Sequence, residues 1–154
     1  MNLQGMWVVL RATNPANPVR NLRIVPKAFE NVSDRQPFHP WVLKDLERYS
    51  VLRFMSWLNT NSDAAPRSWQ QRVTPQSDSQ TGPGGVAWEY IVRLCNQLGA
   101  SPWVNIHHLA DDAYVESVAQ YLKSELRSDV KVYVEHSNEV GGLEWRTECG
   151  PGTT

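Results

Sequence analysis

The feature that most constrains this chain is the alternation of short apolar runs with amphipathic helical patterns. Apolar runs at residues 51–58, 102–109 and 130–139 have the length and composition of strands. Between them, residues 85–99 and 111–126 place apolar side chains every three to four positions, as a helix with one buried face does. Strands that alternate with helices form right-handed βαβ units around a parallel sheet. The sequence therefore predicts an α/β fold.

The N-terminal part predicts two more strands and one more helix. Residues 5–13 are apolar enough for a strand, and residues 21–26 form a second short apolar run. Residues 38–50 have helical spacing, with Pro40 suited to the first turn. We therefore expect four βα units, preceded by an extra N-terminal strand. The polar segment 59–85 is predicted to be a long loop, either functional or disordered.

Several polar residues have predicted structural roles. Gly99 is a natural helix terminator, and Asp111 and Asp112 are expected to cap the helix that follows them. Arg53 and Glu135 share the parity of the inward-facing positions on their strands, so we expect them to form an ion pair.

Composition excludes several classes of protein. The chain has 154 residues, 41% hydrophobic and 20% charged, with a net charge of −1, which is typical of a globular domain. Its Lys and Arg residues form no basic run, which argues against nucleic-acid binding, and no apolar stretch is long enough to span a membrane. The N-terminus is not a convincing signal peptide, and Cys95 and Cys149 indicate no compartment. The localisation is left open.

The segment "VKVYVEHSNEVGG" ends in an amide and a carboxylate, Asn138 and Glu139. Functional groups of parallel α/β sheets gather at the carboxyl ends of strands, and a carboxyl group beside apolar walls is suited to act as a general acid. The other interpretation is that the pair only closes a turn before Gly141 and Gly142. Four further residues are expected at the same edge of the sheet as candidate substrate-binding groups: Trp57, Asn59, His107 and His108. Trp103 is a further candidate for lining the substrate site.

His107 and His108 are neighbours on a predicted strand, so at most one of them should face the cleft. A substrate hydrogen bond, a proton relay and a purely structural role are all open for that histidine. The four histidines of the chain do not have the spacing of a metal site, and we expect neither a metal nor a cofactor.

A resemblance strengthens the catalytic interpretation. The segment 21–140 resembles the first half of a clan A glycoside hydrolase (β/α)8 barrel, through "VLRFMSWLNTN", "GVAWEYIVRLCNQLG", "PWVNIHHLADDAYV" and "VYVEHSNEV". It is most similar to a group of large secreted bacterial proteins, often described as carbohydrate- or cellulose-binding. The resemblance implies that the chain is half of a TIM barrel. It also implies that Glu139 is the acid/base and that Asn138 orients the substrate.

The chain departs from this family in three ways. The family's nucleophilic carboxylate lies on strand seven, whereas this chain stops just after the fourth predicted strand. The pair His107–His108 stands where the family suggests Pro-His. The tail 141–154 fits no element of the barrel, so we interpret residues 1–154 as one truncated, half-barrel domain with a non-homologous tail. The remaining candidates for a second carboxylate are Glu135, Asp111, Asp112, Glu144 and Glu148.

Three functions remain open at this stage. The first is a weak glycoside hydrolase acting on a β-linked sugar, with Glu139 as general acid/base. The second is a carbohydrate-binding module without catalysis, and the third is an inactive barrel fragment stabilised by oligomerisation. Open sheet edges and an uncovered inner face favour association, so we expect a homodimer or a higher homo-oligomer.

Overall fold

The computed structural model describes residues 8–20, 22, 24–33 and 35–139. The chain divides into two compact units, Met1–Pro37 and Phe38–Thr154, and each is considered by itself. The predicted tail 141–154 lies outside the described residues. No helix in the described part of the chain is both long and apolar enough to cross a membrane.

The first unit contains little regular structure. A 3-10 helix, η1, spans Lys27–Phe29, and a single antiparallel bridge joins Asn14 to Asn17. The strands predicted at 5–13 and 21–26 are not formed by the described residues of those segments. Val9 is 71% exposed, so nothing covers the apolar side chain that would have faced a sheet. The described residues therefore form three of the predicted strands, and four βα units are not confirmed.

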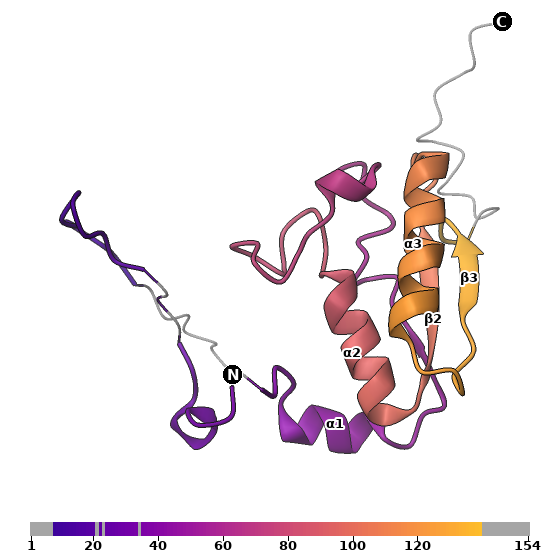
Figure 1. The fold of residues 1–154 in the computed structure, drawn as a ribbon, viewed down its shortest axis with the longest axis horizontal. Helices are drawn as coiled ribbons and strands as arrows, with labels where there is room; N and C mark the ends of the chain where they lie inside the picture. Colours follow the sequence, from indigo (N-terminus) through magenta and orange to yellow (C-terminus); the bar gives the residue numbers. More distant parts are fainter. Residues whose placement is uncertain (1–7, 21, 23, 34, 140–154) are drawn as a thin grey trace, which may run out of the picture. The chain divides into compact units, whose positions relative to one another are not determined.

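The second unit is built on a three-stranded parallel sheet, which confirms the α/β fold (Figure 1). The strands β1 (Val51–Arg53), β2 (Ser101–Ile106) and β3 (Tyr133–His136) lie in the order β1-β2-β3. Arg53 is in register with Trp103, and Asn105 is in register with Glu135. The carboxyl ends of all three strands therefore meet at one edge of the sheet.

The strands are shorter than predicted. The last hydrogen bond between β1 and β2 is donated by the Phe54 N–H to the Trp103 carbonyl, at 2.8 Å. The chain then turns, and the Leu58 N–H donates to the Phe54 carbonyl. Trp57 therefore follows β1 instead of continuing it.

The three predicted helices are present, although each is shorter than its predicted segment. In α1 (Pro40–Leu46), Pro40 occupies the first turn. Helix α2 (Trp88–Leu98) ends at Gly99, whose φ of 67° is the left-handed conformation that glycine adopts without strain. Helix α3 (Asp112–Glu125) is capped by Asp111, which accepts the Tyr114 N–H at 2.6 Å.

The two faces of the sheet differ in chemistry. Helices α2 and α3 lie on one side of the sheet (Figure 1), and their apolar faces pack against Val104 and Ile106 of β2. The helix residues Ile91, Leu94 and Leu122 are almost completely buried there, and each such side chain contributes about 1.5–3 kcal/mol. The opposite face, called the open face below, carries the side chains Arg53, Trp103, Asn105, Tyr133 and Glu135, which share strand parity through the register.

The segment 59–85 is a folded loop, which contains a second 3-10 helix, η2 (Trp69–Gln71). The Trp69 ring packs against the rings of Tyr114 and Tyr121, both on α3, with centroid distances of 6.1 and 5.6 Å. The Arg72 guanidinium stacks over the Trp69 ring at 4.1 Å. These contacts attach the loop to α3, so the alternative of a disordered loop is wrong.

Candidate functional site

The predicted pair Asn138–Glu139 lies in a tight turn directly after β3. Ser137 and Glu139 have φ values of 58° and 47°, in the left-handed region that non-glycine residues rarely adopt. Two hydrogen bonds hold this turn against β2: the Ser137 N–H donates to the Ile106 carbonyl at 2.6 Å, and Asn105 Nδ2 donates to the Ser137 carbonyl at 2.8 Å. Backbone strain that the surroundings enforce is common at functional sites.

An ion pair on the open face supports this turn. Arg53 Nη2 lies 2.8 Å from Glu135 Oε2 and 3.0 Å from Glu135 Oε1, and Arg53 Nε donates to Oε2 at 3.2 Å. The predicted pairing of Arg53 with Glu135 is therefore confirmed. The two side chains are 31% and 24% exposed, and the hydrogen bond from Arg53 lowers the pKa of Glu135. Glu135 is therefore held as a carboxylate.

The same guanidinium positions Asn138. Arg53 Nη2 donates to Asn138 Oδ1 at 2.7 Å, which fixes the amide oxygen. Because an amide has a donor side as well as an acceptor side, this bond leaves the Asn138 NH₂ group to donate to a ligand. The Asn138 side chain can therefore present two donors in a fixed orientation.

Glu139 differs from its predicted setting in two ways. An extended strand would place it about 13 Å from Glu135. Because the chain turns after β3, the Glu139 N–H instead lies 3.4 Å from Glu135 Oε1. Glu139 is also exposed, so the described residues form no apolar wall around it.

Trp103 adds an aromatic surface to this group. Its indole Nε1 donates to Glu135 Oε2 at 2.9 Å, and the Arg53 guanidinium lies 5.1 Å from its ring centroid. The Trp103 side chain is 39% exposed, and its register partner Tyr133, which sequence patterns did not single out, is 46% exposed. Such aromatic surfaces stack against the apolar faces of sugar rings.

Trp57 and Asn59 lie in a different cavity from the Arg53–Glu135 group. They line a cavity of about 560 Å³ whose other wall is the 80–86 part of the folded loop. Asn59, with φ of 49°, donates through Nδ2 to the Pro83 carbonyl at 2.6 Å. Its amide therefore holds the loop in place, and none of the described contacts joins this pair to the Arg53–Glu135 group.

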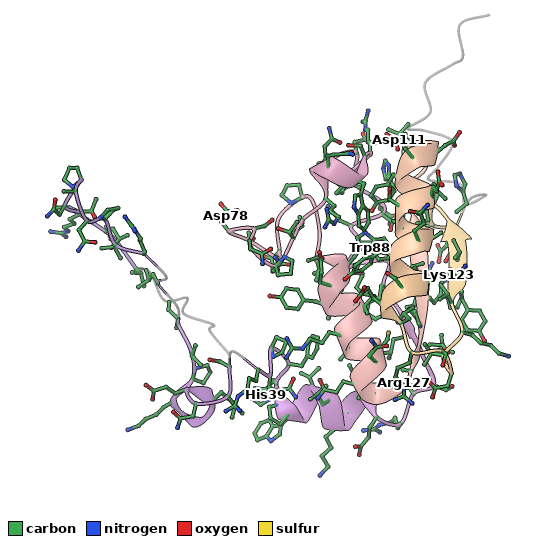
Figure 2. All side chains as sticks on the ribbon, viewed as in Figure 1. His39, Asp78, Trp88, Asp111, Lys123 and Arg127 are labelled. Carbon is green, nitrogen blue, oxygen red and sulfur yellow. The ribbon has the colours of Figure 1, made fainter. Side chains whose placement is uncertain are left out.

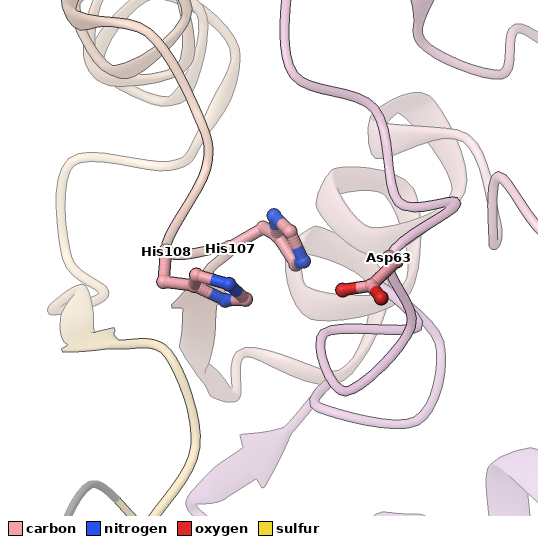
Figure 3. A group of neighbouring side chains, drawn as sticks. All are labelled: Asp63, His107 and His108. Carbon is pink, nitrogen blue, oxygen red and sulfur yellow. The ribbon is translucent and has the colours of Figure 1, made fainter. Parts of the chain in front are cut away.

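His107 and His108 lie together with Asp63, which comes from the folded loop (Figure 3). One nitrogen from each histidine and one Asp63 oxygen lie within 4.8 Å of one another. The two imidazole rings are 4.3 Å apart, so the prediction that they point to opposite faces is wrong. Alternation stops because β2 ends at Ile106, one residue before the pair.

The tautomer of His107 decides what this cluster can bind. The Leu109 N–H donates to His107 Nδ1 at 3.1 Å, and burial, followed by the charges of His108 and Arg67, lowers the pKa of His107. A neutral ring with its lone pair at Nδ1 carries its proton at Nε2. That Nε2 is buried and has no hydrogen-bond partner among the described residues. It is set up to donate a hydrogen bond, whereas a metal at Nε2 would require the proton to move to Nδ1.

The other candidate carboxylates have structural positions or lie outside the description. Asp111 is the cap of α3, as predicted, and Asp112 is in the first turn of that helix. Glu144 and Glu148 fall outside the described residues. Asp63 was not predicted, because it lies 44 positions before His107 in a polar loop and no spacing rule connects the two.

No family model matches the chain, and neither a curated protein nor a solved structure is significantly similar to it. The geometry of the strand ends therefore carries the functional argument alone.

Proposed function

We propose that this chain is a glycoside hydrolase acting on a β-linked sugar, with Glu139 as general acid/base. The observation that supports the proposal most is the bond from Arg53 to Asn138 Oδ1, because it fixes the amide of the residue that precedes Glu139 and leaves its NH₂ group as a donor. A positioned donor next to a carboxyl group is the arrangement that holds a sugar hydroxyl while the glycosidic oxygen is protonated. We further propose that the β1-β2-β3 sheet is part of a half TIM barrel.

The remaining groups have supporting roles in this proposal. Trp103 offers the stacking surface for a sugar ring. The proposed activity is feeble, because Glu139 is exposed and an enclosed site is needed for strong electrostatic stabilisation of the transition state.

A second function, carbohydrate binding without turnover, is favoured by one observation. Trp103 and Tyr133 are adjacent on the open face and are both well exposed, as the aromatic side chains of a sugar-binding surface must be. Glu135, whose Oε1 lies 3.4 Å from the Glu139 backbone nitrogen, is paired with Arg53 and is poorly suited to be a nucleophile.

Hydrolysis of a chromogenic β-glycoside by the wild type and by Glu139→Gln separates the two functions. For a hydrolase we expect Glu139→Gln to lower kcat by about 100-fold or more, as loss of a general acid does. Glu47→Gln, an exposed carboxylate at the end of α1, is the matched control and should keep the wild-type rate.

Binding to insoluble β-glucan is measured on the same proteins. Equal rates for Glu139→Gln and the wild type would remove Glu139 from the chemistry. If glucan binding persists without turnover, and Trp103→Ala abolishes that binding, the binding function is the correct one.

A further inference from the structure

The edge strand β3 has an exposed apolar side chain next to an unpaired backbone edge. Its only strand neighbour among the described residues is β2, so the far side of Tyr133–His136 presents free N–H and carbonyl groups. Val134 is 65% exposed although it has the same parity as the buried Val104. Unprotected strand edges of this kind pair readily with another strand.

An apolar groove continues from this edge to helix α3. Its volume is about 390 Å³, and most of its lining consists of aliphatic side chains of β2, α3 and β3. On the α3 side the lining includes Val115, Ala119 and Lys123, which follow one another at four-residue spacing and therefore lie along one stripe of the helix. Val115 is 41% exposed.

The charges along this stripe of α3 are separated by end. Asp112 and Glu116 lie in its N-terminal half, and Lys123 lies in its last turn. Arg127, just beyond the helix, is paired with Asp129 within the same chain. Figure 2 shows the same polarity, with Asp111 at one end of α3 and Arg127 at the other. A surface with opposite charges at its two ends is complementary to a copy of itself that runs in the opposite direction.

We propose that two copies of this chain associate through β3 and the groove, around a two-fold axis that makes the two strands antiparallel. The strands pair edge to edge, and the two α3 helices lie antiparallel above them. Glu116 and Lys123 are placed almost symmetrically about Ala119. With Ala119 near the axis, Glu116 of each copy therefore faces Lys123 of the other.

The spacing of sheets and helices is compatible with this arrangement. Paired strands lie about 4.8 Å apart. In the joined sheet the two α3 helices lie over positions two to three strands apart, so their axes are separated by roughly 10 to 14 Å. Packed helices lie about 8–10 Å apart, and a small residue such as alanine at the crossing allows the close end of that range. The exposed side chains of Val115 and Val134 fill the remaining space.

The size of the surface sets the expected strength. A four-residue strand and one groove involve fewer residues than the roughly 20–30 per partner of a standard interface. We therefore expect a dimer with a Kd in the range of about 1–100 μM, which dissociates on dilution.

Sedimentation equilibrium on the full chain, from about 5 to 500 μM, spans the expected Kd and tests the proposal. Val134→Glu should leave the protein monomeric at every concentration, because it places a charge in the apolar surface that the two copies bury. Since Val134 is exposed in the single copy, the change should not disturb the monomer fold. Val19→Glu, at a valine of the first unit that is 51% exposed, should dimerise like the wild type.

A charge exchange tests the antiparallel orientation. Glu116→Lys and Lys123→Glu should each raise the Kd by about tenfold, because each places two like-charge pairs across the axis. The double variant restores opposite charges and should return to within about twofold of the wild-type Kd. A wild type that remains monomeric at the highest concentration overturns the proposal. A dimer that is unaffected by Val134→Glu, or not restored by the double exchange, also overturns it.

Discussion

Gly85 should be one of the most sensitive positions of the chain. It lies where the folded loop returns to the core, and the neighbouring Val86 N–H donates to the Trp57 carbonyl at 2.7 Å. Its φ of 77° lies in the left-handed region. A Cβ placed on Gly85 would lie 2.4 Å from the Trp57 carbonyl oxygen, far inside van der Waals contact.

The cost of Gly85→Ala has two parts. The left-handed conformation costs an alanine about 1–2 kcal/mol. To relieve the clash, the Trp57 carbonyl must move, which weakens its hydrogen bond with Val86 and costs about another 1 kcal/mol. With residual strain in the loop, we expect the free energy of unfolding to fall by about 2–4 kcal/mol, with a loss in Tm of roughly 2–4 °C per kcal/mol.

Two other glycines separate the parts of this cost. Gly99 has φ of 67°, but a Cβ there has only ordinary contact with Arg127 Nη1, at 3.6 Å. Gly99→Ala should therefore cost about 1 kcal/mol, for the backbone conformation alone. Gly82 has no positive φ, and Ser79 Oγ lies at 3.8 Å, so Gly82→Ala should be neutral or stabilise by about 0.4–1 kcal/mol.

Urea unfolding followed by tryptophan fluorescence measures the three variants against the wild type. The argument requires the order Gly85→Ala, Gly99→Ala, Gly82→Ala, from least to most stable. It is refuted if Gly85→Ala lies within about 0.5 kcal/mol of Gly82→Ala, the usual range for harmless surface changes.

Two more predictions concern titration and metal binding. The pKa of Glu135 is lower in the folded state than its unfolded value, near 4.5. The ionised Glu135 side chain therefore stabilises the fold fully above that unfolded pKa, and this stabilisation is lost as the pH falls through the folded pKa. At pH 7, the free energy of unfolding of Glu135→Gln should therefore be about 1 kcal/mol below that of the wild type. At low pH the two proteins should be equally stable, and urea titration at both pH values measures the difference. Zn²⁺ should leave the Tm unchanged in a thermal melt, because moving the ring proton of His107 to Nδ1, as a metal at Nε2 requires, would break the hydrogen bond from the Leu109 N–H. A rise in Tm that His107→Gln removes, and that His136→Gln keeps, would contradict the assigned tautomer.

Much of the second unit could be predicted from the sequence, because local signals specify its helices. Pro40, Gly99 and Asp111 act within one turn of themselves, and each marks a helix end that the structure confirms. The pairing of Arg53 with Glu135 followed from strand parity alone. Parity within a strand depends only on that strand being extended, and Arg53 and Glu135 both lie inside their strands.

The prediction failed where strands end. Periodicity did not show that β1 stops at Arg53, that β2 stops at Ile106 or that a left-handed turn follows β3. Those end points depend on hydrogen bonds between segments far apart in sequence, such as the one from Ser137 to Ile106. The position of Asp63 beside the histidines depends in the same way on how the loop packs through Trp69.

The order of the strands also has a consequence for how the chain gains structure. Trp103 pairs with Tyr133, 30 residues later, whereas Val51 pairs with Ser101, 50 residues later. Closing the longer loop costs only about 0.4–0.5 kcal/mol more entropy, since this cost grows with the logarithm of length. During synthesis, however, β1 and α2 both emerge before β2, the strand with which β1 pairs and against which α2 packs. The apolar stripe of α2 must therefore wait for β2, which makes the central strand the element around which the nascent domain condenses.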